Sequence, residues 1–225
     1  MKQAKQSDSR STEEFFDSYA EGFNAIYGNR QNLINRLLNR FFRRSMLLRY
    51  RLTLQACEPV IGKSILDVGC GPGHYSVELA RRGAGEVLGI DFAPAMIGLA
   101  SAKAVDAGVQ AICRFEVGDF LGMDESRCYD HVILMGFMDY LPDPDAVVGK
   151  ALRLCRNSAL FSFPVSSGLL ALQRRLRYRK RCPLYLYSLS RVERLFSERN
   201  GIRFLVRKIG RDYWVRAESA GGQNS

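Results

Sequence analysis

Three glycines on alternate positions, with one acid before them and another after, are the residues of this chain best placed to do chemistry. Gly69, Gly71 and Gly73 follow a short apolar run and lead directly into a helical pattern. Glycine allows the unusual dihedral angles of a tight strand-to-helix turn and lets a ligand lie on the backbone. Asp91 ends the next apolar run, where an acid can accept hydrogen bonds from both hydroxyls of a ribose. The pattern predicts an adenosine-containing cofactor across the carboxyl ends of two parallel strands.

The spacing of the glycines distinguishes between cofactor classes. A dinucleotide-binding loop has the pattern G-x-G-x-x-G, whereas this chain has G-x-G-x-G followed by His74. Asp67 stands two residues before the first glycine. The run L-D-V-G-C-G-P-G at 66–73 resembles motif I of the class I S-adenosylmethionine (SAM)-dependent methyltransferases. The resemblance implies SAM as the cofactor and S-adenosylhomocysteine as its product.

Three further motifs of that family follow in order, and the resemblance covers residues 60–165. They are the acid and helix start Asp91–Met96, the acid-containing turn Val117–Phe120 and the fourth strand Tyr129–Gly136. The resemblance implies that the glycine loop contacts the methionine portion of SAM, Asp91 the ribose and Asp119 the adenine amine. It places Phe92 and Met96 on the faces of adenine. The complete set that we assign to the cofactor is Asp67, Gly69, Cys70, Gly71, Gly73, Asp91, Phe92, Met96, Asp119, Phe120, Met135 and Tyr19.

The loop after the fourth strand, Gly136–Pro142, is expected to contact the methyl acceptor. Asp139 and Tyr140 stand where the family often places acceptor-contacting or basic residues, and either could orient or deprotonate a hydroxyl. The alternative is that Tyr140 packs and Asp139 caps a turn, and His74 is a further candidate for the base. This loop lacks the acid-Pro-Pro-aromatic motif of amino-methylating nucleic-acid enzymes and the nucleophilic cysteine of cytosine-C5 enzymes. Methylation of a base amine or of cytosine C5 is therefore disfavoured.

Apolar runs and amphipathic stretches alternate along the chain, which is typical of a parallel sheet with right-handed crossovers. Strands are predicted at 64–69, 86–91, 111–117, 129–136 and 158–164, helices at 74–82, 94–107, 143–156 and 189–199, and a closing hairpin at 202–208 and 213–217. We predict an α/β fold with a Rossmann-like, seven-stranded, mostly parallel sheet. A C-terminal antiparallel hairpin, helices on both faces and an N-terminal helical lid complete it.

Three regions are predicted: an N-terminal helical lid or extension at 1–57, a SAM-binding domain at 58–218 with an insertion at 166–188, and a disordered tail at 219–225. The Phe-Asp-x-x-Ala-x-x-Phe pattern that begins at Phe16 resembles the lid helix of small-molecule methyltransferases, which caps the bound cofactor. A second helix is expected over 33–48, with leucines and phenylalanines on one side and arginines on the other. Residues 52–60 are expected to finish a helix that leads into the first strand.

Cysteine usage and hydropathy limit the class of protein. The six cysteines are scattered without a C-x-x-C pair, and the chain has two histidines. This predicts no metal site and no disulfide framework, but the reduced thiols of a cytoplasmic protein. The polar N-terminus does not resemble a signal peptide, and no apolar run approaches the roughly 20 residues of a membrane span.

The formal net charge of +10 is unevenly distributed. Residues 22–57 contain seven arginines and no acid, and residues 146–192 contain ten lysines or arginines and no acid. One interpretation is a solvated face. A second is an anionic membrane surface as partner, which suits an amphipathic basic helix. A third is RNA, with Tyr178, Tyr185 and Tyr187 as stacking partners, although the neighbouring Leu184 and Leu186 favour a pocket wall or lid over a stacking platform.

We predict a SAM-dependent methyltransferase that is cytoplasmic or peripheral at a membrane surface and acts on a small or lipid-like acceptor at oxygen. Features outside the core, among them Arg49, Arg51 and the insertion, resemble the ubiquinone-biosynthesis and magnesium-protoporphyrin O-methyltransferases. One alternative is an RNA methyltransferase that docks through residues 30–51 and 174–181. Another is a SAM-binding protein without transferase activity. No oligomeric state is predicted.

Overall fold

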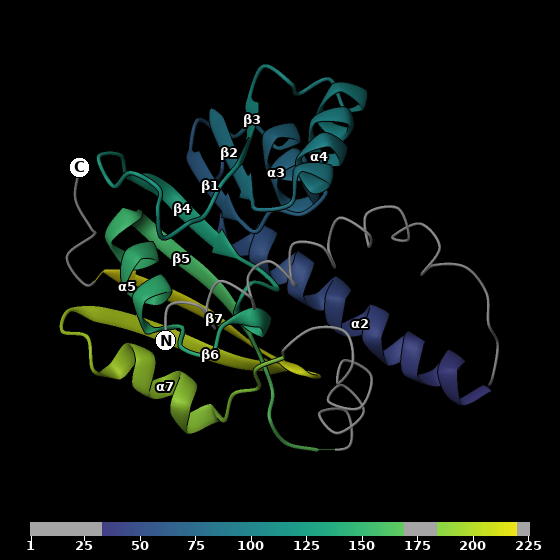
Figure 1. The fold of residues 1–225 in the computed structure, drawn as a ribbon, viewed down its shortest axis with the longest axis vertical. Helices are drawn as coiled ribbons and strands as arrows, with labels where there is room; N and C mark the ends of the chain where they lie inside the picture. The colour runs from purple at the N-terminus through teal and green to yellow at the C-terminus, as the bar shows by residue number, and fades with distance from the viewer. Residues whose placement is uncertain (1–32, 169–183, 220–225) are drawn as a thin grey trace, which may run out of the picture.

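A seven-stranded sheet organises the chain. The computed structural model describes residues 33–168 and 184–219, and its strands follow the order β3-β2-β1-β4-β5-β7-β6 (Figure 1). Neighbours among β1 to β5 pair in parallel, and β7 pairs antiparallel with both β5 and β6. The predicted Rossmann-like sheet with a C-terminal antiparallel hairpin is confirmed. The strands are β1 (Ser64–Val68), β2 (Glu86–Asp91), β3 (Cys113–Val117), β4 (Tyr129–Leu134), β5 (Cys155–Pro164), β6 (Ile202–Ile209) and β7 (Asp212–Ser219).

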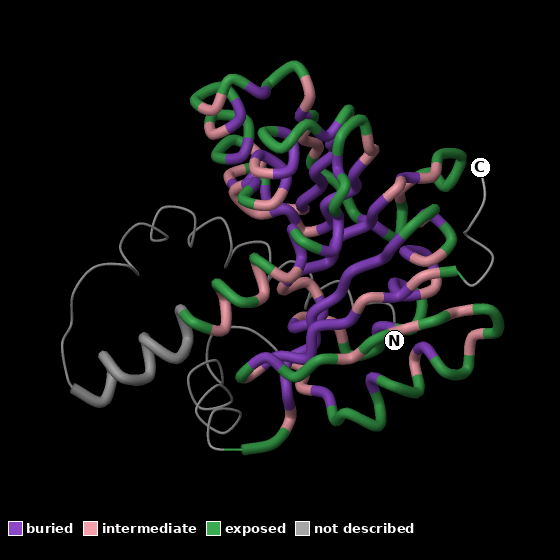
Figure 2. Tube along the Cα trace, turned by 180° about the vertical axis from the view of Figure 1, so that it is seen from behind, coloured by how far each residue is buried: buried purple, intermediate pink, exposed green. Residues whose placement is uncertain are grey.

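Helices cover both faces of this sheet, and a short 3-10 helix follows β4. The helices are α2 (Leu33–Ala56), α3 (His74–Arg81), α4 (Pro94–Asp106), η1 (Met138–Tyr140), α5 (Asp145–Leu154) and α7 (Leu189–Ser197). One apolar cluster joins Leu54 of α2, Leu79 of α3 and Ala104 of α4 to the sheet. A second cluster joins Val148 of α5 and Phe196 of α7 to the opposite face. The buried residues therefore run through the middle of the molecule, with the exposed ones outside (Figure 2).

The burial of the strands explains why their sequences are apolar in different ways. In central β1, Ile65, Leu66 and Val68 are all fully buried, as expected for a parallel strand covered on both faces. In β6, which lies at the edge of the sheet, half-buried and exposed positions alternate from Ile202 to Arg207, and Leu205 is 58% exposed. The carboxyl ends of the parallel strands, followed by loops, form the edge at which ligands bind in such sheets.

Helix α2 differs from the prediction. It continues through residues 49–51 without a break, because no glycine or proline interrupts it, and it ends at Ala56 and not at residue 60. Thr53 and Leu54 are buried against the body. Leu48, which the pattern placed on the apolar side, is 37% exposed. A Cβ atom at Gly210, in the β6–β7 turn, would collide with the Ser45 hydroxyl, so α2 lies directly against this turn.

Several predictions concern residues that the structure does not describe. The lid helix with Tyr19, residues 169–183 of the insertion with their basic segment 174–181, and the tail from residue 220 lie outside the described residues. The division into regions at residue 57 stays a prediction. Strand β4 ends two residues earlier than predicted, at Leu134, and Gly136 then turns the chain with a φ of 81°.

Candidate active site

The glycine loop between β1 and α3 has the backbone shape that only glycine adopts readily. Gly69, Gly71 and Gly73 have φ angles of 64°, 52° and 70°. A Cβ atom on Gly69 would lie 2.7 Å from Cδ2 of Phe137, whereas a Cβ atom on Gly71 would meet nothing within 4 Å. Gly69 therefore allows close packing against the loop after β4, and Gly71 keeps the backbone open on its other side. Such an open turn at a helix start suits a ligand that lies on the main chain.

Asp91, the last residue of β2, fastens this loop to the next strand end. Its Oδ2 accepts a hydrogen bond from the Gly71 amide at 2.9 Å, and its Oδ1 accepts one from the Ala93 amide at 3.0 Å. The Gly118 amide, after β3, donates to the Asp91 main-chain carbonyl at 3.0 Å. A carboxylate at this strand end is an acceptor of the kind that a ribose diol requires. The acid thus joins the ends of three elements that sequence reasoning assigned to one cofactor.

Asp67 has a different environment from Asp91. It is 1% exposed, and its Oδ2 accepts a short 2.6 Å hydrogen bond from the Ser76 hydroxyl of α3. Burial raises the pKa of Asp67 to about 6, although the Ser76 hydrogen bond opposes that shift. The Asp67 side chain therefore links β1 to α3 and supports the glycine loop that connects them.

The other predicted cofactor residues divide into buried and accessible side chains. Cys70, Met96, Phe120 and Met135 are buried, each with at most 8% exposure. The Cys70 thiol lies toward β2, since a Cβ atom on Gly89 would be 3.1 Å from its Sγ atom. These four can offer a ligand mainly their backbone. Phe92 is half-buried at the end of β2.

Asp119 lies after β3 and is exposed. Its Oδ1 accepts a hydrogen bond from the Leu121 amide at 3.2 Å. The Gly118 link to Asp91 places this turn beside the end of β2. The structure therefore brings the two acids that we expected at adenosine to adjacent strand ends.

Arg49 of α2 reaches the same edge of the sheet. Its Nη1 atom lies 3.4 Å from Asp212 Oδ2 and 3.5 Å from Ser162 Oγ, and the Gly136 amide donates to that Oγ atom at 2.8 Å. The Arg49 Nε atom is buried and has no hydrogen-bond partner. Burial alone would lower the pKa of Arg49, but Tyr75, Asp212 and Asp139 together raise it. A cation that is held beside the glycine loop and the β4 loop can bind a carboxylate.

A polar chain around Tyr75 connects α2 to the first turn of α3. The Tyr75 hydroxyl forms hydrogen bonds with Arg49 and Thr53, and burial raises its pKa. The Thr53 hydroxyl also accepts from Nε1 of Trp214 at 3.1 Å and contacts the Met135 sulfur at 3.5 Å. The position of Arg49 is thus set by residues from α2, α3 and β7. Because burial keeps the Tyr75 phenol protonated, it acts as a hydrogen-bonding group and not as a base.

The two predicted catalytic residues lie in η1, directly after β4. Asp139 is 8% exposed and contributes to the electrostatic environment of Arg49, whereas Tyr140 is half-buried. The Tyr185 amide donates to the main-chain carbonyl of Asp139 at 2.9 Å, so the described end of the insertion packs on η1. The charge of Asp139 therefore adds to that of Asp212 in raising the pKa of Arg49.

Tyr187 shows how the end of the insertion is fixed. Its side chain is fully buried, its hydroxyl donates to the carbonyls of Met138 and Leu141, and its amide donates to the Pro164 carbonyl at 2.8 Å. Burial raises its pKa. The expectation that Tyr187 stacks on RNA is therefore wrong, because the ring belongs to the core and packs edge-on against Phe163 at 5.3 Å.

His74 faces α4 and not the acceptor loop. The Nζ atom of Lys103 lies 2.9 Å from its Nδ1 atom. Burial and the charge of Lys103 lower the pKa of His74. A neutral imidazole that accepts a hydrogen bond from a lysine is occupied structurally, which removes support for His74 as the base.

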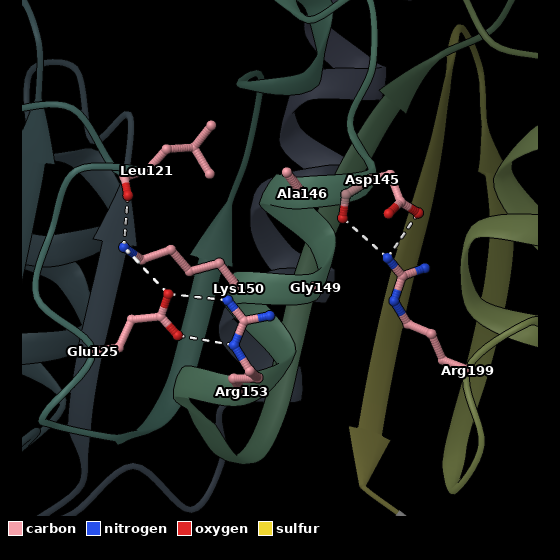
Figure 3. A pocket seen from close by; sticks show the side chains of 8 residues that line it. All are labelled: Leu121, Glu125, Asp145, Ala146, Gly149, Lys150, Arg153 and Arg199. Carbon is pink, nitrogen blue, oxygen red and sulfur yellow. Dashed lines mark hydrogen bonds and ion pairs between the residues drawn. The ribbon is translucent and has the colours of Figure 1, made fainter.

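A pocket of about 460 Å³ lies at α5, with charged side chains around it (Figure 3). Arg153 pairs with Glu125 at 2.9 Å, and Arg199 pairs with Asp145 at 2.8 Å. Lys150 is buried and donates to the main-chain carbonyls of Leu121, at 3.1 Å, and Met123. Lys150 and Arg153 thus hold the crossover from β3 to β4, and the Arg199–Asp145 pair fastens the start of α5. None of these side chains belongs to the predicted cofactor set.

Sequence reasoning missed Ser162, Asp212, Thr53 and Tyr75 as members of the site. Ser162 had a usable signal, since it is a lone hydroxyl inside the apolar run Ala159–Pro164. Asp212 resembled an ordinary turn residue of the hairpin, and its role depends on α2 crossing the sheet, which local patterns do not encode. No group of three or more metal-ligating side chains occurs within the described residues, and none of their helices has the length and apolarity to cross a membrane.

Sequence comparison places this site in a family. Residues 60–174 match the family model described as a methyltransferase domain. The chain is 36% identical over 98 residues to the ubiquinone biosynthesis O-methyltransferase of Hahella chejuensis, covering 44% of this chain and 41% of that protein. It is 35% identical over 98 residues to the enzyme of the same name from Xylella fastidiosa, covering 44% and 39%. The match thus spans about two fifths of the length of these curated relatives.

Structure comparison agrees over a larger share of the chain. The magnesium protoporphyrin IX methyltransferase of Synechocystis PCC 6803, solved with bound SAH, superposes with a TM-score of 0.75 at 19% identity. The superposition covers 94% of this chain and all of that one. The fold and the glycine loop define a class I SAM-dependent methyltransferase, as predicted. The chain belongs to the methyltransferase domain family.

Proposed function

We propose that the protein uses SAM to methylate an oxygen atom of a small or lipid-like acceptor. The observation that carries this proposal is the convergence of the open glycine loop, Asp91 and Arg49 at the carboxyl edge of the sheet. The names of the similar proteins, which are O-methyltransferases of ubiquinone biosynthesis and a magnesium protoporphyrin IX methyltransferase, support oxygen as the methylated atom.

The residues at this edge fit the chemical groups of SAM. The backbone at Gly71 is open for close approach, and Asp91 has lone pairs that suit a ribose diol. Asp119, at the neighbouring strand end, would accept from the adenine amine. Arg49 carries a positive charge and a buried, unpartnered Nε–H, which suit the carboxylate of the amino-acid portion. Bound SAM supplies a methyl group on a positively charged sulfur with a good leaving group.

The chain's own contribution is to align the acceptor and exclude water, which is catalysis by proximity. The acceptor oxygen forms a bond to the methyl carbon, the carbon–sulfur bond breaks, its electron pair stays on sulfur, and the acceptor hydroxyl loses a proton. Asp139 and Tyr140 are the groups that we propose for contact with that hydroxyl, since both follow β4 beside Arg49. Asp139 would hold or receive the proton, and Tyr140 would orient the oxygen.

The surface around η1 supports an apolar acceptor. Phe137, Leu141 and Tyr185 are half-buried and pack against the main apolar cluster. Hydrogen bonds from Tyr185 and Tyr187 fasten the end of the insertion to η1, so this wall is a fixed part of the site. An aromatic or lipid-like molecule would bury apolar area there.

An RNA acceptor is less consistent with the structure, because Tyr187 is not available for stacking. We favour an anionic membrane surface over RNA as the macromolecular partner, with the protein cytoplasmic or peripheral at that surface. The cysteines Cys57, Cys70 and Cys113 are free and buried, in agreement with a reducing compartment.

Two measurements on the purified protein test the proposal. Calorimetric titration with SAM and with S-adenosylhomocysteine should show micromolar binding of both. Mass spectrometry of the native extract, followed by turnover with the class of molecule found, should identify a hydroxyl-bearing apolar acceptor. Cofactor binding with co-purified RNA would support the alternative acceptor. Cofactor binding without turnover of any phenol, carboxylic acid or lipid would support a SAM-binding protein without transferase activity.

A further inference from the structure

A stripe of exposed residues on α2 has an unusual composition. Arg44, Leu47, Leu48 and Arg51 are spaced at i, i+3, i+4 and i+7, so they share one face of the helix. All four are exposed, and Leu47 and Leu48 are 54% and 37% exposed. The stripe therefore presents two neighbouring leucines between two arginines. We call these four residues the α2 stripe.

The other side of the same helix turns is anchored, so the exposure of the stripe is not a consequence of a loose helix. Ser45 lies against the β6–β7 turn at Gly210, and Arg49 interacts with Ser162 and Asp212. Thr53 is fully buried. The rotation of α2 is fixed by these contacts, and the α2 stripe must face outward.

The α2 stripe lies at the edge where the acceptor would enter. Its inward neighbours Ser45 and Arg49 contact the β6–β7 turn and the loop after β4, both at the carboxyl edge of the parallel strands. Toward its N-terminus, α2 extends away from the sheet (Figure 1). A flat surface bound to the stripe would therefore lie next to the site and would not cover the outer faces of α5 or α7.

The charge of α2 indicates what this surface carries. The helix sequence from Leu33 to Ala56 contains six arginines and no acidic residue. Upstream of the stripe, the i, i+3, i+4 spacing continues with Leu37, Arg40 and Phe41, which again mix apolar and basic residues. Helices that lie in a membrane interface bury apolar side chains at the acyl boundary and place arginines at the lipid phosphates.

We propose that the α2 stripe docks the protein onto an anionic lipid surface, with α2 in the plane of the interface. Leu47 and Leu48 would enter the boundary between headgroups and acyl chains, and Arg44 and Arg51 would bind lipid phosphates. This inference does not depend on the proposed transfer reaction, because it concerns only the outer face of α2. It explains how an apolar acceptor reaches the carboxyl edge without crossing water.

Vesicle co-sedimentation of the full chain tests the apolar half of the stripe. The wild type should bind vesicles with phosphatidylglycerol and should not bind vesicles of phosphatidylcholine alone. Leu47→Ser/Leu48→Ser should lose about tenfold or more in lipid affinity, because two leucine side chains no longer enter the interface. Leu99→Ser/Leu205→Ser is the matched control, since these leucines are 40% and 58% exposed on α4 and β6. The control should bind like the wild type.

The electrostatic half is tested with Arg44→Ser/Arg51→Ser. Each basic residue near an anionic surface contributes several-fold to affinity, so the pair should lose about tenfold or more. Binding of the wild type should fall at 1 M salt, where the screening length shortens to about 3 Å. Circular dichroism and thermal unfolding should show the same fold for every variant.

Three results would overturn the proposal. The first is equal binding of wild type and Leu47→Ser/Leu48→Ser to anionic vesicles. The second is no binding of the wild type to phosphatidylglycerol at millimolar lipid. The third is a dimer in light scattering that dissociates in the leucine variant, which would show that a second copy of the chain covers the stripe.

Discussion

Two buried groups should make the pH dependence of stability an unusually sharp test of the structure. His131 of β4 is 5% exposed, its Nδ1 lies 2.7 Å from Ser158 Oγ, and burial lowers its pKa from 6.5 to about 4. A lowered folded-state pKa means that stability is complete above 6.5 and is lost as the pH falls toward 4. Asp67 has the opposite shift, from 3.8 to about 6. Stability from Asp67 is therefore complete below 3.8 and is lost as the pH rises through 6.

The two effects have similar size and opposite sign between pH 7 and pH 4.5. Linkage gives about 2 kcal/mol lost through His131 on acidification and about 2 kcal/mol gained through Asp67, so they nearly cancel in the wild type. Asp67→Asn should remove the gain, and this variant should lose about 2 kcal/mol more than the wild type over that range. His131→Asn should become more stable on acidification by about 2 kcal/mol relative to the wild type.

Urea unfolding at pH 7 and pH 4.5, followed by the fluorescence of the single tryptophan, measures these differences directly. Trp214 is 4% exposed, so its emission reports unfolding of the core. All other titrating groups are shared by the three proteins, and their contributions cancel in the comparison. Identical pH dependence of Asp67→Asn and wild type would refute the assignment of Asp67 as a buried acid with a raised pKa. A shift of the two variants in the same direction would refute the reasoning about both groups.

Three further substitutions test the site and its supports. Arg49→Met should weaken S-adenosylhomocysteine binding by about tenfold or more and leave adenosine binding nearly unchanged, because adenosine has no carboxylate. Equal losses for both ligands in calorimetry would contradict the role that we assign to Arg49. Gly210→Ala should lower the free energy of unfolding by about 1–3 kcal/mol, because φ is 64° there and the new Cβ meets Ser45. Adding Ser45→Gly should recover part of that loss, and no recovery would disprove the contact between α2 and the turn. Lys150→Met should lower the free energy of unfolding by about 1–3 kcal/mol, because two carbonyls of the β3–β4 crossover lose their donor. Urea unfolding measures this loss, and an unchanged midpoint would show that Lys150 does not hold that crossover.

The sheet, and the approach of the glycine loop to the strand-end acids, were predictable because their signals are local. Apolar runs, glycine spacing and the acids at strand ends lie within a few residues of each other, and a parallel sheet brings successive carboxyl ends to one edge. The hydrogen bond from the Gly71 amide to Asp91 joins two such motifs in the way their order along the chain suggests.

The part of the site built by α2 was harder to predict because it depends on contacts between residues distant in sequence. Arg49 and Asp212 are 163 residues apart, and Trp214 and Thr53 are 161 apart. Hydrophobic periodicity predicted that Leu48 is buried and that the arginines of α2 form its exposed polar face. Burial of Arg49 is possible only because Asp212, Ser162 and Tyr75 come together around it, and no local pattern contains that information.

For η1, the position in the chain was predictable and the tertiary contacts were not. Asp139 and Tyr140 were predicted from their position after the fourth strand, and the structure places them there. The leucine neighbours of Tyr185 and Tyr187 favoured a buried wall over an exposed platform, but the hydrogen bonds that attach these tyrosines to η1 were not predicted. Burial of the Tyr187 hydroxyl against two carbonyls decides between those two interpretations.

Titration of S-adenosylhomocysteine into the wild type and into Asp91→Asn is the most direct test of the central claim that this edge binds SAM. The account predicts micromolar binding to the wild type and a loss of about 100-fold in the variant, since two charge-assisted hydrogen bonds to the ribose are weakened. Circular dichroism should show the same fold for both proteins. No binding to the wild type, or unchanged binding to Asp91→Asn, would contradict the assignment of the site.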